Sequence, residues 1–191
     1  MIPGIVASGS GLSSPTPIDV DPWEEVGRVT AVSGGKLTLS GLDLEGAIAL
    51  RLIIDGVTVT TDSTDMFMRF LISGTEESGD FYQWSLYSFA SGTASTPDFN
   101  NEIRLTDVGA NLGVGNAGTD SFSATITIFD PTSVLHKIGT ISNVNYMDGN
   151  GNLQGTEGGN VSLDVSGKIT GVVLYGSSDL LTGSIIALAV S

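Results

Sequence analysis

The stretch SFSATITIF, residues 121–129, decides the fold class of this chain. Its apolar side chains at positions 122, 124, 126 and 128 alternate with Ser and Thr at the positions between them. This period of two predicts a β-strand that buries one face and exposes the other. Such a strand needs neighbouring strands for its backbone and a second layer to cover its apolar face, so the rest of the chain must supply both.

Strand-like segments lie on both sides of this stretch and are separated by turn-rich sequences. Only residues 41–54 also carry some helical pattern, and Gly41 and Gly46 interrupt it. About a dozen short strands without a long helix predict an all-β, antiparallel β-sandwich or jelly roll. The further strand-like segments are 24–32, 36–41, 47–54, 57–61, 65–73, 81–89, 102–108, 137–147, 160–165, 168–176 and 184–190.

Composition sets limits on the partners of the chain. With 191 residues it is long enough to bury a core, and without cysteine it has neither disulfides nor thiolate metal ligands. Its 21 acidic and 7 basic residues give a net charge of −14, and the basic residues are scattered singly. Since nucleic acids and anionic membranes both attract clustered positive charge, neither is an expected partner.

The N-terminal residues form a short apolar peptide and a spacer. MIPGIVAS, residues 1–8, contains no Lys or Arg and is interrupted by Pro and Gly, which disfavours a secretory signal, and it is too short to cross a membrane. Residues 13–22, SSPTPIDVDP, hold three prolines, which predict an extended spacer before a domain at 23–191. We therefore expect residues 1–12 to dock on another protein through the side chains of Ile2, Pro3, Ile5 and Val6.

Catalytic groups are scarce in the sequence. His136 is the only histidine, and no G-x-S-x-G motif accompanies it. A Ser-His-Asp triad would have to use this one residue. An exposed or hydrogen-bonded histidine in a turn is the favoured interpretation, so we expect no enzymatic activity and no cofactor.

One loop resembles part of a calcium site. In MDGNGNLQGTEGGN, Asp148, Asn150 and Asn152 have the alternating oxygen spacing of a calcium-binding loop. The similarity ends where Leu153 stands in place of the required Gly and Gly159 in place of the closing Glu. Asn and Gly also favour a hairpin turn here, so a turn is preferred over a metal site.

Aromatic residues gather in FYQWSLYSF, residues 81–89. As a strand, this segment places Tyr82 and Trp84 on one face and Tyr87 on the other. Exposed Trp and Tyr rings can stack on sugars, which makes these three residues candidates for a glycan site. Aromatic residues on both faces of a strand are more often part of a sandwich core or a subunit interface, so these two alternatives are favoured over a glycan site.

Both ends of the chain resemble a family of small virion surface proteins of tailed bacteriophages. MIPGIVAS is similar to the family's M-(L/I)-G-I-(I/V)-A-S start, and KITGVVLYGSSDLLTGSIIALAVS, residues 168–191, is similar to its two closing strands. The segment around IFDPTS, residues 128–133, matches an internal strand and turn more loosely. The chain departs from the family in its Pro-rich spacer and in Ala-Leu-Ala at 187–189, where an aromatic-Gly ending is usual.

The resemblance implies a minor structural, decoration or tail-fibre protein on the virion surface. We expect a β-sandwich that is docked to other virion proteins by its N-terminal peptide, forms a homotrimer and contributes to host attachment, with a host-surface glycan as a further expected partner. A capsid cement protein and a free carbohydrate-binding module are the alternatives. A hydrolase is the least favoured function.

Overall fold

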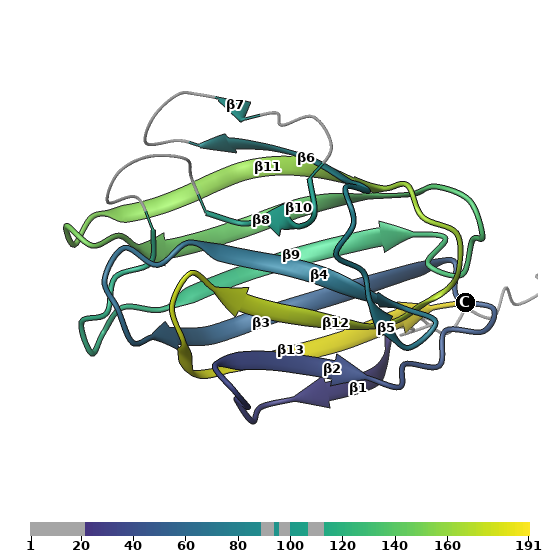
Figure 1. Ribbon diagram of the computed structural model, residues 1–191, viewed down its shortest axis with the longest axis horizontal. Helices are drawn as coiled ribbons and strands as arrows, with labels where there is room; N and C mark the ends of the chain where they lie inside the picture. Colours follow the sequence, from purple (N-terminus) through teal and green to yellow (C-terminus); the bar gives the residue numbers. More distant parts are fainter. Residues whose placement is uncertain (1–21, 89–93, 96–99, 107–112) are drawn as a thin grey trace, which may run out of the picture.

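A computed structural model describes residues 22–88, 94–95, 100–106 and 113–191, which form two antiparallel β-sheets packed against each other (Figure 1). The predicted all-β sandwich is therefore confirmed. Ile2, Pro3, Ile5 and Val6, which we expect to dock on another protein, lie outside the described residues, as does the expected spacer up to residue 21.

The larger sheet has eight strands in the order β1-β13-β3-β9-β10-β11-β6-β7. All of its pairings are antiparallel. Its strands are β1 (Glu24–Val29), β13 (Leu180–Val190), β3 (Ala49–Val59), β9 (Phe122–Phe129), β10 (Lys137–Met147), β11 (Leu153–Leu163), β6 (Tyr82–Ser88) and β7 (Ala94–Ser95).

The smaller sheet lies in front of the larger one in Figure 1. It has the order β2-β12-β4-β5, and a short strand, β8, also pairs with β4. Its strands are β2 (Lys36–Ser40), β12 (Ile169–Gly176), β4 (Met66–Ile72), β5 (Thr75–Glu76) and β8 (Ile103–Arg104).

The predicted alternation of residues 121–129 is present in β9. Phe122 and Ile126 are fully buried and Ala124 and Ile128 nearly so, whereas the Ser and Thr residues between them are partly exposed. β9 pairs with β3 on one side and β10 on the other, so its inward side chains lie in the middle of the core between the sheets. A period-two pattern at this central place fixes which face of the large sheet is outside.

Several strand boundaries differ from the sequence-based expectation. Segments 47–54 and 57–61 join into one long strand, β3, which passes through a register shift between Ile54 and Val57. Only Ile103–Arg104 of segment 102–108 is a strand among the residues described there. β11 begins at Leu153 and includes the Gly-rich residues that were expected to form a loop, because both of its edges pair with neighbouring strands.

Ile126→Ala tests the central position of β9. Truncating this fully buried side chain is expected to lower the free energy of unfolding by about 2–5 kcal/mol, because a cavity opens in the core. Thr127→Ala is the matched control on the outer face of the same strand and should change it by less than about 0.5 kcal/mol. Urea denaturation measures both values, and equal effects would contradict the assigned faces.

Candidate binding groove on the outer face of the large sheet

Side chains on the outer face of the large sheet form aligned rows across β9, β10, β11 and β6. The first row joins Phe129, Ile138, Ser162 and Gln83 through their strand registers. Phe129 is 46% exposed and Ile138 is 60% exposed, so this row presents apolar surface next to hydroxyl and amide groups. Neighbouring strands lie about 4.8 Å apart, which makes the row a continuous surface.

The second row is entirely polar. It joins Thr127, Thr140, Asn160 and Ser85, again through consecutive registers. Thr140 and Asn160 are exposed, and Ser85 is partly buried. The Oγ of Ser85 accepts a hydrogen bond from the backbone N–H of Asn160 at 3.3 Å. Hydroxyl and amide groups therefore lie side by side in the middle of the face.

The next level along the strands is hollow because Gly158 carries no side chain. Gly158 pairs with the half-exposed Tyr87 on β6. A Cβ built on Gly158 would meet only the backbone oxygen of Ile141, at 3.6 Å, so the space beside Tyr87 is open. Register shifts in β3, β10 and β11 occur at this level, and such bulges bend a sheet locally.

Together these rows enclose a groove with two connected hollows. One hollow, of about 640 Å³, lies at the Phe129 and Ile138 end. The other, of about 470 Å³, lies at the Tyr87 end. Both are lined by Ser85, Thr140 and Asn160, so they form one continuous groove, which we call the sheet groove.

The sheet groove carries no charge among its described lining residues. The sequences of β6, β9 and β13 contain no charged residue, and β11 contains only Glu157. Lys137, the single charged residue of β10, points inward and is 2% exposed. The described lining of the groove is thus uncharged, although the chain has a net charge of −14.

The three candidate aromatics of β6 do not share one surface. Tyr82 is fully buried. Its hydroxyl accepts a hydrogen bond from the backbone N–H of Phe70 at 2.9 Å and donates one to the backbone oxygen of Glu77 at 3.0 Å. Burial raises the pKa of this hydroxyl. Trp84 is 7% exposed and also belongs to the core, the alternative that the sequence had left open. Tyr82 and Trp84 are therefore core residues, although Trp84 borders the first hollow of the groove, and of the three rings only Tyr87 is exposed on the outer face.

The calcium-like loop is a tight turn between β10 and β11. Asp148 is 1% exposed and accepts hydrogen bonds from the backbone N–H groups of Asn150 and Asn152, both at 2.9 Å, and from the Gln154 amide at 2.7 Å. Its carboxylate is thus engaged by its own loop, as expected for a turn. The described residues contain no group of three or more His, Cys, Asp or Glu residues that could hold a metal ion.

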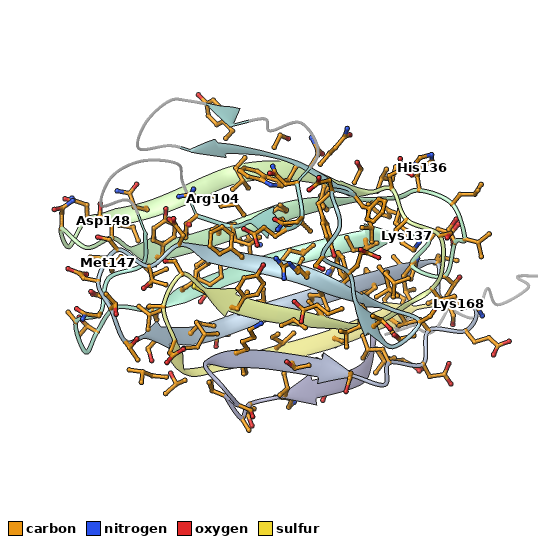
Figure 2. The ribbon with its side chains drawn as sticks, in the orientation of Figure 1. Arg104, His136, Lys137, Met147, Asp148 and Lys168 are labelled. Atoms are coloured by element: carbon orange, nitrogen blue, oxygen red, sulfur yellow. The ribbon has the colours of Figure 1, made fainter. Side chains whose placement is uncertain are left out.

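His136 lies at the end of the domain opposite to Asp148 (Figure 2). Its Nδ1 is 2.9 Å from the Asp164 carboxylate, and both side chains are more than half exposed. The neighbouring Lys137 is instead buried, and its ammonium donates to the backbone oxygens of Leu135 and Val165 at 3.2 and 3.1 Å. Desolvation lowers the pKa of Lys137. This end therefore carries an exposed contact between His136 and Asp164 and a buried structural lysine.

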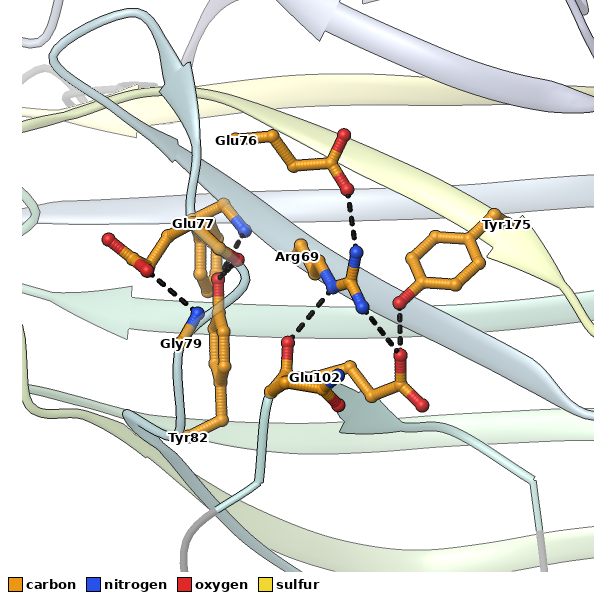
Figure 3. Close-up of polar contacts among 9 residues, drawn as sticks. Arg69, Glu76, Glu77, Gly79, Tyr82, Glu102 and Tyr175 are labelled. Carbon is orange, nitrogen blue, oxygen red and sulfur yellow. Dashed lines mark hydrogen bonds and ion pairs between the residues drawn. The ribbon is translucent and has the colours of Figure 1, made fainter.

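A charged network covers the outer face of the small sheet (Figure 3). Arg69 pairs with Glu76 at 3.0 Å and with Glu102 at 3.1 Å, and the Tyr175 hydroxyl donates to Glu102. Burial and the adjacent Glu102 raise the pKa of Tyr175. Lys36 also lies 5.0 Å from the Tyr175 ring centroid. These groups connect β4, β5, β12 and the residue before β8, so the network ties the small sheet together. It contrasts with the uncharged groove.

Comparison with known proteins gave no assignment. Neither a scan against protein-family models nor a search of the curated proteins found a match to this chain. In the part of the chain that the structure describes, no helix is long and apolar enough to cross a membrane.

Asp148→Asn tests the role of the carboxylate in the turn. Burial by itself raises the pKa of Asp148, but the hydrogen bonds from Asn152, Gln154 and Asn150 outweigh it and hold the pKa below its usual value of 3.8. The ionised group therefore stabilises the fold above pH 3.8, and this contribution is lost as the pH falls through the lower folded value. Near neutral pH the substitution should lower the free energy of unfolding by about 1–3 kcal/mol.

The pH dependence separates this electrostatic role from simple packing. In urea denaturation, the difference between wild type and Asp148→Asn should shrink at about pH 3. Asn150→Ala is the control, because Asn150 contacts the carboxylate only through its backbone N–H. If wild type and Asp148→Asn differed in stability by the same amount near neutral pH and at low pH, the stabilising role of the ionised carboxylate would be contradicted.

Proposed function

We propose that this chain is a non-enzymatic structural protein of a bacteriophage virion that displays a β-sandwich on the particle surface. Residues 1–12 bury Ile2, Ile5 and Val6 against another virion protein, and the Pro-rich residues 13–22 hold the domain away from the docking point. The resemblance of both ends of the chain to virion surface proteins supports this function. The domain assembles as a homotrimer, and several copies on one particle provide avidity for the host.

The organisation of the core is the structural observation that carries the proposal. Both sheets turn their apolar faces toward each other. The core between them is formed by buried residues that are spread along the sequence from Leu37 to Ala189. The sandwich thus has the two layers that its strands need. An apolar peptide before such a domain gains most by burial in a different molecule, which is the requirement for docking.

Deletion of residues 1–12 tests the docking role. The truncated protein should remain soluble and keep the wild-type melting temperature, because the sandwich supplies its own core. It should be absent from purified particles, as measured by immunoblot of virions produced from a phage genome that carries the deletion. Normal incorporation of the truncated protein would refute the docking role.

Point variants refine the same experiment. Ile2→Asp, Ile5→Asp and Val6→Asp combined should prevent incorporation, since charged groups are costly to bury. Ser8→Asp, Ser10→Asp and Ser13→Asp combined add the same charge at polar positions and serve as the matched control. If both triple variants failed to enter particles, the added negative charge itself, and not the loss of the apolar side chains, would be responsible.

A capsid cement function is the alternative within structural proteins. A cement clamps neighbouring capsomers, so particles that lack it should lose DNA at a lower temperature than wild-type particles. Particles that lack a displayed attachment protein should keep their heat resistance and adsorb to host cells more slowly. Heating and adsorption assays on the same deletion phage therefore distinguish the two functions.

A further inference from the structure

A ligand of the sheet groove must be recognised through side chains. The groove lies over β10 and β11, which are internal strands paired on both edges. Their backbone N–H and C=O groups are already used in the sheet, so an extended peptide cannot add to it here as a new strand. This constraint favours a ligand that brings its own hydrogen-bonding groups to the exposed side chains.

The groove side chains retain unused hydrogen-bonding capacity. Within the described residues, neither the Thr140 hydroxyl nor the Asn160 side-chain amide has a protein partner in a recorded hydrogen bond. Gln83 accepts from the Ser162 hydroxyl at 3.4 Å through Oε1, which leaves its amide NH₂ free to donate. Both donors and acceptors are therefore available along the groove for a ligand rich in hydroxyl groups.

The charge and the shape of the groove restrict the ligand further. No charged side chain lines it among the described residues, so it offers no counter-ion to an acidic or basic ligand. A second copy could pack closely on this face only if its own side chains filled both hollows of the groove. Stable protein interfaces pack as densely as protein interiors, so a subunit contact here requires a partner surface shaped to the groove.

We propose that the sheet groove binds a neutral polysaccharide of the bacterial host surface. Thr140 and Asn160 hydrogen-bond the sugar hydroxyls, the Tyr87 ring stacks on a sugar face, and the space above Gly158 admits a sugar ring. The Phe129 and Ile138 end covers the apolar side of a neighbouring sugar. The inference depends on the proposed virion function only for the source of the polysaccharide, while the groove chemistry defines its class.

Filling the hollow at Gly158 gives the sharpest test. Gly158→Val places a side chain beside Tyr87 at a position without a positive φ, so the strand should fold normally. Gly118→Val is the matched control, because Gly118 also has open space and no positive φ but does not line the groove. The full-length proteins are applied to a printed array of neutral and acidic bacterial surface polysaccharides.

Wild type and Gly118→Val should bind neutral polysaccharides, and Gly158→Val should lose at least about tenfold in apparent affinity. Tyr87→Ala and Asn160→Ala should weaken binding in the same way, while Leu153→Ala, which changes an exposed residue at the start of β11 outside the groove, should not. Binding only to acidic polysaccharides, no binding to any polysaccharide, or an unchanged affinity of Gly158→Val would overturn the proposal.

Two further measurements separate this proposal from its alternatives. If sedimentation shows a wild-type oligomer that Gly158→Val and Asn160→Ala both dissociate, the groove is a subunit interface and the polysaccharide proposal fails. Incorporation of Gly158→Val into particles should be normal, since the docking peptide is intact. If residues 1–12 prove unnecessary for incorporation but the array result holds, only the proposed virion docking fails.

Discussion

Burial of every second residue on the strands of the large sheet is the constraint on which the rest of the structure depends. On β9, the inward side chains are almost completely removed from water, and the paired strands β3 and β10 show the same alternation. A register slip of one residue would place these apolar groups in solvent and hydroxyl groups in the core. The same constraint aligns Thr140 with Asn160 and Asn160 with Ser85, so packing inside the sandwich determines the row of polar groups outside it.

The outer face of the small sheet carries ion pairs, whereas the described lining of the groove on the large sheet is uncharged. On the small sheet, acidic side chains are paired with scarce cations, as in the contacts of Arg69 with Glu76 and Glu102 and of Arg104 with Asp65 at 2.6 Å. Partly buried pairs of this kind stabilise a structure only when their hydrogen bonds are satisfied, which Figure 3 shows for Arg69. On the large sheet, the groove contains no such pairs among its described residues, and uncharged polar groups and exposed rings remain for contact with a neutral ligand.

The sequence alone predicted the fold class because alternation is a local signal, readable in residues 121–129 without knowledge of their neighbours. It also placed Tyr87 and Trp84 on opposite faces of β6, although it could not say which face was buried. The groove itself could not be predicted, since β6 pairs with β11 across more than seventy residues and the row of Ser85 and Asn160 exists only after this pairing. Gly158 was assigned to a loop because glycine locally favours turns, whereas pairing on both edges places it in a strand.

The order of strands in the large sheet connects the proposed docking and binding functions. The described chain starts at Pro22, directly before β1, which forms one edge of the sheet, and the groove lies over β9, β10, β11 and β6 toward the other edge. From β1 to β11 there are five strand spacings, or about 24 Å at 4.8 Å each. The start of the described chain therefore lies at the edge of the large sheet farthest from the groove. This separation is compatible with the proposal that one copy docks through residues before β1 and binds a ligand in the groove.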